Sequence, residues 1–525
     1  MGRFEIFNPP RLTQATDEVI GNFLVKSNNE ISITAALAVF VFYYSYLLLF
    51  RTPLSLLADP DTFWHISTGQ WILDHAQFPT VDFFSYTANG KPWISTEWLS
   101  EILFATAYKF GGWRAVSVLS ATAYAATAAI LCFYLLRHLR FSVAIGWTAL
   151  TVTAISLHFL ARPHIFSFVL IVIWTINLLN AYDDEDSSLP SVFSLAPLMI
   201  LWANLHGSFT FGLLLLYIFA ACCFYQRVIR RADLEWWRPV AIASVITICA
   251  MITPYGFRPA LMTFAVLNLK FTIQHIDELQ PLDFQKHTLL LMYFVAILMV
   301  IAGLGIRLRA ARLIMFGLIT FVGLSYSRAL TMYFLLVPIV LARPLAGCVH
   351  YFAPQFPGMK EFEVDQTSDP VLNFLQKRSM AVLACCLTLA SLITVSTWWR
   401  KDIMPPSSIA PKAAIDFVRS ANIAGNVFNG YGFGGYLIFR GIPTFIDGRA
   451  LPFGDDFLHK YFDTINLVDT SAAFGVLDEY NVNWIILQPD EPLAKALAQS
   501  ALWNQVFSDK DSVVFVRRRQ ASENG

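Results

Sequence analysis

An acidic and aromatic stretch follows the first apolar run of the chain. It reads Asp59-Pro60-Asp61-Thr62-Phe63-Trp64-His65, and Asp61 and His65 stand one turn apart if the stretch is helical. Carboxylates and imidazoles are the side chains that carry proton transfer, and an Asp-x-Asp pair can also hold a divalent metal. A segment that only joins two elements needs neither group, so we take this stretch as the candidate site.

The same segment contains further aromatic and acidic residues. Phe63, Trp64 and Trp71 can lie on one side of a helix at a membrane interface. Asp82 and Glu97 follow later in the segment. This density of Trp, Asp, His and Glu predicts a function at a membrane surface.

The composition places these residues in a membrane protein. Of 525 residues, 56% are hydrophobic and 14% are charged, and the mean hydropathy is +0.54. Soluble proteins carry about 25% charged residues, so an ordinary soluble enzyme is excluded. Lys and Arg number 37, as do Asp and Glu, so the chain lacks the excess of positive charge with which proteins bind nucleic acid.

Eleven apolar runs approach the roughly 20 residues that a transmembrane helix needs. They are 31–50, 115–136, 142–160, 165–182, 190–203, 208–226, 239–253, 287–304, 310–324, 329–347 and 379–398. The run 190–203 is short and ends at Asn204-Leu205-His206-Gly207, so 190–226 is either two spans or one bent span. We expect an α-helical polytopic membrane protein with about eleven transmembrane helices within residues 31–398.

The seven cysteines predict neither a disulfide framework nor a zinc site. Six lie inside apolar runs and Cys348 lies at the end of one, and no CxxC or Cys/His cluster occurs. We interpret them as small core side chains. Residues 1–30 are polar and mixed in charge, unlike a cleavable signal peptide, so the first run is expected to stay as an anchor.

The distribution of Lys and Arg predicts the orientation, because cytoplasmic loops are enriched in these residues. With residues 1–30 in the cytoplasm, the cytoplasmic segments hold 16 Lys and Arg, and the opposite side holds nine before residue 399. An odd number of spans then leaves two large extracytoplasmic segments, which are the first outer loop (51–114) and residues 399–525.

Residues 399–525 are predicted to form a small α/β domain after the linker Pro405-Pro406-Ser407-Ser408. The expected strands are Gly435–Phe439, Pro443–Ile446, Val482–Leu487 and Ser512–Val516, and the expected helices are Pro411–Arg419, Ser471–Tyr480 and Pro492–Gln499. The glycines at 430, 432, 434 and 435 favour a turn between strands over a phosphate-binding loop. Asp447 and Arg449 favour a structural ion pair.

These features together resemble the GT-C superfamily of integral-membrane glycosyltransferases. The resemblance rests on Asp59-Pro60-Asp61 just after the first span, on the Trp-His-x-x-x-Gly-x-Trp pattern of 64–71, and on a multi-span body with an outer C-terminal domain. The branch that it resembles contains lipid A aminoarabinose transferases, protein mannosyltransferases and rhizobial galacturonosyltransferases. Phe428–Leu437 and Phe445–Arg449 also resemble the C-terminal regions of bacterial membrane proteins in this group.

The resemblance implies a reaction and its partners. Such enzymes move a sugar from a polyprenyl-phosphate donor to a glycan, lipid or protein acceptor. They do so among membrane lipids on the outer face of the bacterial cytoplasmic membrane. A carboxylate takes the proton of the attacking hydroxyl or amine, and cations hold the phosphate as its charge grows.

The resemblance assigns proton removal, by position, to Asp61 or Asp59. We prefer Asp61, because Asp59 precedes Pro60 and its backbone is held extended. Structural roles stay open for both, a helix N-cap for Asp59 and a first-turn acid for Asp61. Asp82 and Glu97 would serve as a second acid or as ligands of sugar hydroxyls, unless they are caps or surface acids.

The phosphate ligands that the resemblance requires are sought among cations at the outer ends of predicted spans. Arg162 and Arg328 are the main candidates, unless they only reach lipid headgroups. His65 would orient Asp61 or bind the phosphate, unless it bonds to the backbone.

Weaker substrate-binding candidates are His164, His206 and Asn204. Asn204 and His206 interrupt an apolar run, which favours a position in the wall of a cavity. The loop 254–286 corresponds to a segment that often gates the lipid site in related enzymes. Its charged candidates are Lys270, His275, Asp277 and Glu278.

Three points stay open. The oligosaccharide-transferring relatives use a divalent metal and the single-sugar group generally does not, so we expect no metal and no other cofactor. A lipid-linked glycan polymerase or ligase is an alternative enzyme. A flippase of lipid or glycan, which would need ionisable residues at mid-membrane depth, or a non-catalytic scaffold are the alternatives from other classes.

Overall fold

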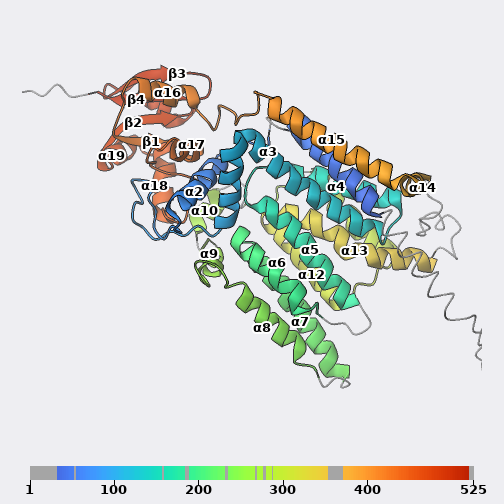
Figure 1. Ribbon diagram of the computed structural model, residues 1–525. Coiled ribbons are helices and arrows are strands. Elements are labelled where there is room, and N and C mark those ends of the chain that lie inside the picture. Colours follow the sequence, from blue (N-terminus) through green and yellow to red (C-terminus); the bar gives the residue numbers. More distant parts are fainter. Residues whose placement is uncertain are drawn as a thin grey trace, which may run out of the picture.

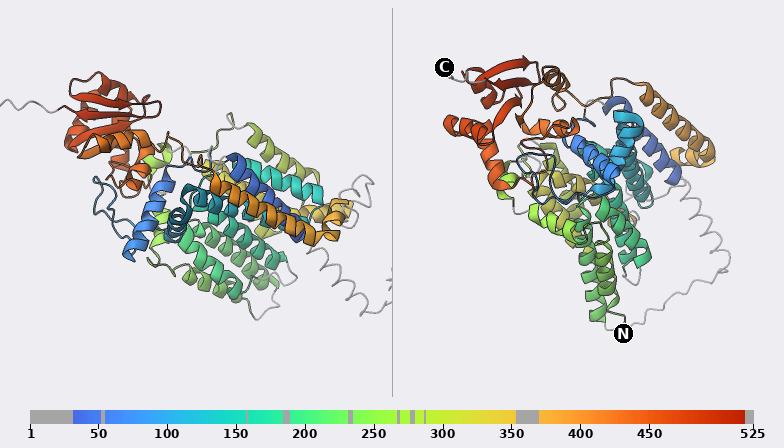
Figure 2. Two further views of the ribbon diagram at one scale, coloured as in Figure 1. Left: turned by 45° about the horizontal axis from the view of Figure 1, so that its top comes forward. Right: turned by 60° about the vertical axis from the view of Figure 1, so that its left-hand side comes forward.

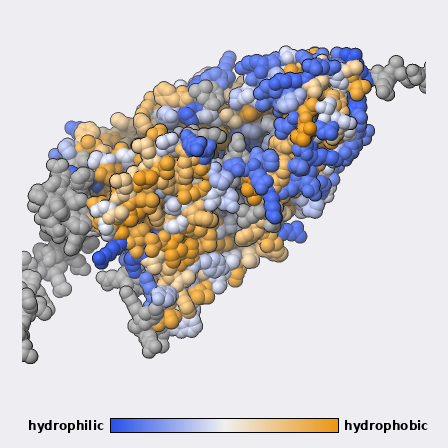
Figure 3. Space-filling view, turned by 180° about the vertical axis from the view of Figure 1, so that it is seen from behind, coloured by the Kyte–Doolittle hydropathy of each residue, from blue (hydrophilic) through white to orange (hydrophobic). Residues whose placement is uncertain are grey.

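A body of long apolar helices carries a small sheet-containing domain at one end (Figure 1). The computed structural model describes residues 32–51, 55–156, 159–183, 189–230, 235–266, 269–275, 280–285, 288–352 and 370–518. Hydrophobic residues cover much of the helical body, and hydrophilic residues gather over the C-terminal domain (Figure 3). The predicted fold class is confirmed.

Apolar helices occupy the positions of all eleven predicted spans. Six of those in the described residues are long and apolar enough to cross a membrane. They are Ser32–Arg51, α3 (Trp98–Leu136), α5 (His164–Asp183), α7 (Phe209–Arg230), α13 (Leu330–Phe352) and α15 (Ser379–Trp399). The first ends in the π-turn η1 (Leu47–Arg51), and the 3-10 turn η4 (Ser327–Ala329) leads into α13. Five are shorter: α4 (Phe141–Ile155), α6 (Val192–Leu205), α8 (Arg238–Cys249), α11 (Thr288–Gly303) and α12 (Ala310–Ser325). The seven cysteines are free. The side of the membrane that each helix end faces stays a prediction.

The region 190–226 is two helices. His206 separates α6 from α7, with an extended backbone at φ −166° and ψ 143°. Asn204 and His206 therefore lie where one helix ends and the next begins, as expected for residues that interrupt an apolar run.

Two helices fill the first outer loop. The first is α2 (Asp61–His75), and the second is the outer part of α3, which starts at Trp98 and is broken at Gly112 by a positive φ of 60°. A Cβ at Gly69 would overlap the backbone carbonyl of Glu101, so glycine lets α2 and α3 pack backbone to backbone.

The predicted helix after the first span is confirmed, but protein covers its apolar side. Phe63 is 1% exposed, and its ring centroid lies 5.0 Å from that of Trp113 and 5.2 Å from that of Tyr436. Such edge-to-face pairs bury large apolar area in a fixed geometry. Phe63 thus joins α2 to the C-terminal domain instead of lying in lipid.

The C-terminal domain contains a four-stranded mixed sheet in the order β1-β2-β4-β3. The strands are β1 (Asn426–Asn429), β2 (Val482–Leu487), β3 (Trp503–Ser508) and β4 (Val513–Arg517), and only β1 and β2 pair in parallel. Its helices are α16 (Lys412–Ser420), α17 (Gly434–Phe439), α18 (Asp455–Ile465), α19 (Thr470–Glu479) and α20 (Pro492–Ala498), with a 3-10 turn, η6 (Tyr431–Phe433).

Two strand predictions in this domain are wrong. Gly435–Phe439 is helical within α17, because its aromatic side chains pack on α2 and this tertiary contact outweighs β propensity. Pro443–Ile446 contributes a single bridge between Thr444 and Ser85. The expected strand at Val482–Leu487 and the three expected helices are confirmed to within two residues.

The domain is joined to the helical body through a shared core. Trp113 and Phe63 belong to the same buried cluster as Leu437 and Trp484 of the domain. Three short helices lie outside the main set: α9 (Arg258–Val266), α10 (Lys270–His275) and α14 (Pro370–Lys377). Figures 1 and 2 show the domain at the end of the body where α2 lies. Elements from both parts of the chain therefore lie at that end.

Candidate functional site

One guanidinium group holds the two aspartates that follow the first helix. Arg162 Nε pairs with Asp59, and Arg162 Nη2 lies 2.7 Å from Asp61 Oδ2. Asp59 Oδ1 also accepts the backbone N–H of Asp61 at 2.7 Å. The Asp59 side chain is 1% exposed and that of Asp61 is 19% exposed. Asp59 is therefore fixed inside the protein, whereas Asp61 is accessible.

Local structure explains how these groups meet. Asp61 is the first residue of α2, where the helix dipole favours a negative charge. Arg162 lies in the segment between α4 and α5. Ala161 of this segment is hydrogen-bonded to the first outer loop. The Ala161 N–H donates to the Leu56 carbonyl at 2.9 Å, and the Ala161 carbonyl accepts the Thr62 hydroxyl at 2.9 Å. The structure thus brings Arg162 to Asp59 and Asp61, which lie far from it in the sequence.

Glu97 and His206 form a second pair beside this one. His206 Nε2 lies 3.2 Å from Glu97 Oε1, and His206 Nδ1 accepts the backbone N–H of Ser208 at 3.1 Å. In the neutral imidazole, Nε2 therefore carries the proton and faces Glu97. Burial lowers the pKa of His206 to about 3, so this imidazole is neutral.

The pKa of Glu97 is raised to about 7, above all by burial of its carboxyl group. The positive charges of Arg328 and Arg162 act in the opposite direction, and the negative charge of Asp61 adds to the rise. Arg328 lies on η4 and is exposed. These electrostatic effects group Arg328 with Glu97, His206 and the aspartates.

His65 connects Glu97 to a buried acid that the sequence analysis did not select. His65 Nδ1 lies 3.2 Å from Glu101 Oε1, and His65 Nε2 lies 3.8 Å from Glu97 Oε2. Glu101 is 1% exposed and accepts the Ser95 hydroxyl. His65 was expected to orient Asp61, to bind the phosphate or to bond to the backbone, but its contacts join it to the two glutamates. The spacing of Glu97 and Glu101, four residues apart, was the signal that could have identified this pair.

Asp82 lies in a buried cluster behind the site. Arg449 Nη1 lies 2.6 Å from Asp82 Oδ1, and Arg449 Nη2 lies 2.7 Å from Asp447 Oδ2. All three side chains are at most 1% exposed. The guanidinium also lies over the rings of Phe84, at 5.0 Å, and Trp93, at 4.7 Å. The expected pair of Asp447 and Arg449 is confirmed, and Asp82 joins the first outer loop to the C-terminal domain.

Two glycines of the C-terminal domain touch the acidic stretch. A Cβ at Gly448 would overlap Asp61 Oδ1, and a Cβ at Gly435 would overlap the Pro60 carbonyl oxygen. Glycine is required where backbones approach this closely. Gly435 was interpreted as part of a turn, whereas its contact shows that it lets the domain close on the start of α2.

The side chains of His164 and Asn204 are bonded to neighbouring protein groups. His164 Nε2 lies 3.3 Å from the Tyr124 hydroxyl. Asn204 Oδ1 accepts the indole N–H of Trp98 at 2.8 Å, and its amide nitrogen donates to the carbonyls of Ile200 and Ile252. Asn204 therefore uses both ends of its side chain to hold the helices that carry Glu97 and His206.

The loop 254–286 is fastened to the C-terminal domain. Lys270 and His275 are the end residues of α10, and the Phe271 and Thr272 N–H groups donate to Asp455 at 2.8 and 3.1 Å. Asp277 and Glu278 lie outside the described residues.

A metal is the other group that an Asp-x-Asp pair can hold. In the described ranges no group of three or more His, Cys, Asp or Glu side chains has the arrangement of a metal site. Between Asp59 and Asp61, the Arg162 guanidinium takes the place that a shared cation would occupy.

Several solved structures are similar to this chain in fold. The oligosaccharyltransferase of Archaeoglobus fulgidus, tethered with an acceptor peptide, has a TM-score of 0.50 and 10% identity, over 86% of this chain and 68% of that chain. The chain has the GT-C fold. ArnT from Cupriavidus metallidurans bound to undecaprenyl phosphate has a TM-score of 0.43 and 14% identity, over 92% of this chain and 97% of that one.

A third GT-C structure is AglB from Archaeoglobus fulgidus in complex with an inhibitory peptide and a dolichol-phosphate. Its TM-score is 0.48 and its identity 9%, over 87% of this chain and 69% of that chain. No family model and no curated protein matches the sequence. The expected architecture is thereby confirmed at the level of the fold.

Proposed function

We propose that this protein is a GT-C glycosyltransferase of the bacterial cytoplasmic membrane. It moves a sugar from a polyprenyl-phosphate donor to an envelope glycan, lipid or protein on the outer face. The observation that supports this proposal best is the accessible Asp61 carboxylate beside Arg162, Glu97 and Arg328, at one end of a body of apolar helices. The oligosaccharyltransferase with the same fold favours sugar transfer over lipid translocation.

Asp61 is the proposed general base. Its Oδ2 pairs with Arg162, and its Oδ1 lies directly against the backbone of Gly448, where a side chain would displace the carboxylate. The acceptor oxygen or nitrogen bonds to the anomeric carbon, the bond from that carbon to the phosphate oxygen breaks, and the acceptor proton moves to Asp61. Asp59 has a positioning role, because it is buried and holds both Arg162 and the Asp61 N–H.

Arg328 is the proposed main ligand of the donor phosphate. Arg162 already pairs with two carboxylates, so its charge is largely compensated. Arg328 is exposed and lies near an open cleft of about 580 Å³ lined by Phe321, Leu324 and Tyr326. An apolar cleft beside a cation suits a prenyl chain with its phosphate.

The proposal is tested by a transfer assay with purified protein and a panel of polyprenyl-phosphate sugars. Arg328→Ala is expected to weaken donor binding by about tenfold or more, because a charge-assisted contact to phosphate is lost. Arg258→Ala, another exposed cation, is the control and should bind donor like the wild type. Equal donor affinity in both variants would remove Arg328 from the site.

The same assay is run in EDTA, where transfer is expected to continue. The reason is that the Arg162 guanidinium contacts both aspartates and compensates their charge. Transfer that stops in EDTA and returns with Mg²⁺ or Mn²⁺ would contradict this.

The donor KM is expected to depend on the charge of Glu97. Its pKa is raised to about 7, so Glu97 is mostly neutral below that pH and ionised above it. An ionised Glu97 repels the anionic donor, so the donor KM should rise about fivefold as the pH passes upward through 7. Glu97→Gln should flatten this profile. A profile that is unchanged in Glu97→Gln would assign the titration to another group.

Gly448→Ala is expected to lower the transfer rate by about 10²-fold, because the new methyl group displaces Asp61 and small misplacements of catalytic groups are costly. The control is Gly475→Ala in α19, where a Cβ would meet no atom within 4 Å. Wild-type transfer by Gly448→Ala at normal abundance would show that Asp61 does not act from this position.

A further inference from the structure

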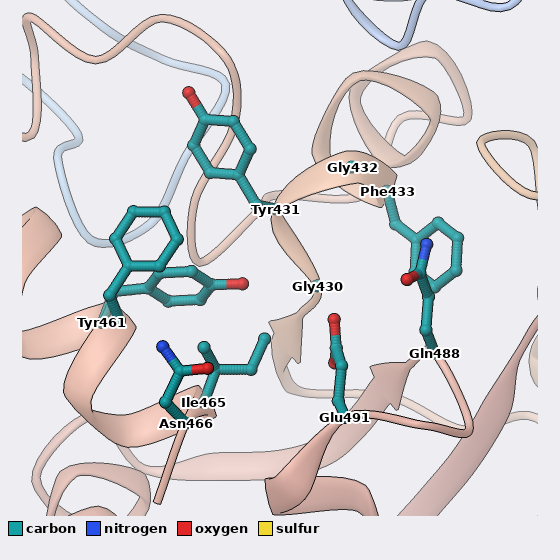
Figure 4. A pocket seen from close by; sticks show the side chains of 10 residues that line it. Gly430, Tyr431, Gly432, Phe433, Tyr461, Ile465, Asn466, Gln488 and Glu491 are labelled. Carbon is teal, nitrogen blue, oxygen red and sulfur yellow. The ribbon is translucent and has the colours of Figure 1, made fainter. Parts of the chain in front are cut away.

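A separate cavity lies within the C-terminal domain (Figure 4). Its volume is about 240 Å³, and it is lined by η6, by α18 and by the segment between β2 and α20. This is slightly smaller than the ~300–1,000 Å³ of pockets that hold drug-sized ligands. The occupant that fits is a single small ring or group.

The position of the cavity is typical of a binding site in an α/β fold. Gly430 and Gln488 line it, and they directly follow β1 and β2, the two parallel strands of the sheet. Ligands of α/β sheets bind outside the carboxyl ends of parallel strands, because loops diverge there and leave a crevice. Gly430 and Gly432 add no side chains, which keeps the space open.

The lining combines aromatic rings with uncharged hydrogen-bonding groups. The rings come from Tyr431, Phe433, Tyr461 and Phe462, and the polar groups from Asn466, Gln488, Glu491 and the tyrosine hydroxyls. Amides, hydroxyls and a carboxyl group supply both donors and acceptors. None of the ten described lining residues is Lys, Arg or His, so a phosphate or carboxylate would meet the Glu491 carboxyl group without a compensating cation.

The Glu491 carboxyl group of this lining is only partly hydrogen-bonded. Its Oε2 atom is buried and has no hydrogen-bond partner among the described residues. Burial raises the pKa of Glu491 to about 7, so near neutral pH its carboxyl group can donate as well as accept a hydrogen bond. Figure 4 shows Glu491 and Tyr461 pointing into the space beside Gly430 from two sides. A buried polar atom without a partner is costly, and a ligand hydroxyl would satisfy it.

We propose that this cavity binds one neutral pyranose ring, with an aromatic face against the ring and its hydroxyls on Glu491, Gln488 and Asn466. An ammonium group is the less suitable occupant, because it offers no acceptor to the amide N–H groups of Gln488 and Asn466. The cavity is next to the transfer site along the chain, since η6 leads directly into α17, whose Gly435 touches Pro60. Under the proposed function, the pocket would take one sugar of a glycan acceptor. This last role rests on the proposed function, but binding itself does not.

The test uses the full-length protein in a detergent without a sugar headgroup. The probes are the methyl glycosides of glucose, galactose and mannose at millimolar concentration, and binding is followed by saturation-transfer NMR. At least one probe is expected to bind, and Glu491→Ala is expected to weaken its affinity about tenfold. Glu491 occupies the N-cap position of α20, but its side chain makes no capping hydrogen bond. The substitution therefore leaves the capping of α20 unchanged. Gln488→Ala is the second pocket variant and should weaken the same probe.

Matched controls separate this pocket from the transfer site. Glu479→Ala removes an exposed acid of the same domain and should bind like the wild type. Asp61→Asn should also keep full binding, so a failed transfer reaction leaves this test intact. The proposal is overturned if no probe binds, or if folded Glu491→Ala and Gln488→Ala both bind like the wild type.

Discussion

Asp61→Asn is expected to lower sugar transfer by about 10²–10⁴-fold, the usual contribution of a general base. The amide keeps an oxygen that accepts from Arg162, so the local structure should be retained, while the group that takes the proton is lost. The measurement is the transfer rate at saturating donor, with donor affinity determined separately. Donor affinity is expected to change little.

Asp74→Asn is the matched control for this variant. Asp74 lies on the same helix and is exposed. Its side chain accepts a hydrogen bond from Gln70 at 2.7 Å, and its described contacts do not include Arg162. It should transfer sugar like the wild type. Full transfer by Asp61→Asn at normal abundance would refute the base assignment. Unchanged transfer together with a loss of lipid translocation would favour a flippase instead.

Arg449→Ala is expected to destabilise the protein by about 3–5 kcal/mol, because it leaves the carboxylates of Asp82 and Asp447 buried without their cation. The lost contacts with the rings of Phe84 and Trp93 add to the effect. The change should appear as a lower apparent Tm and as protease sensitivity of the C-terminal domain.

Two further variants make this prediction specific. Arg449→Lys restores one charge but cannot bridge two carboxylates in the same way, so it should recover only part of the stability. Lys412→Ala breaks an exposed pair with Asp416 in the same domain and should cost less than about 1 kcal/mol. A Tm for Arg449→Ala that equals the Tm of Lys412→Ala would show that the buried cluster is not what holds the domain.

The sequence was sufficient for features that depend on local pattern. Apolar runs located the helices, because a helix that lies in lipid must be apolar whichever helices it packs against. The position of Asp61 after the first run located the candidate site. The placement of Arg162 and Arg328 at helix ends also followed from the cost of charge at depth. These predictions needed no knowledge of which segments meet.

Features that depend on distant contacts were missed. Asp82 was a candidate second acid or sugar ligand, with a cap or a surface acid as the alternative, but Arg449 binds it in a buried cluster from the other end of the chain. Gly435 begins a segment with the composition of a strand, and it is helical because it packs on α2. Glu101 was passed over although it stands four residues after Glu97, because its contact with His65 joins two separate helices.

The contact between Gly448 and Asp61 also bears on how the protein is made. The ribosome delivers Asp61 early and Gly448 only near the end, so a nascent chain presents its acidic residues without the cover that the last domain provides. Only the completed polypeptide has this cover. A chain that is truncated or stalled in biosynthesis would therefore remain a helical body whose acidic stretch is uncovered.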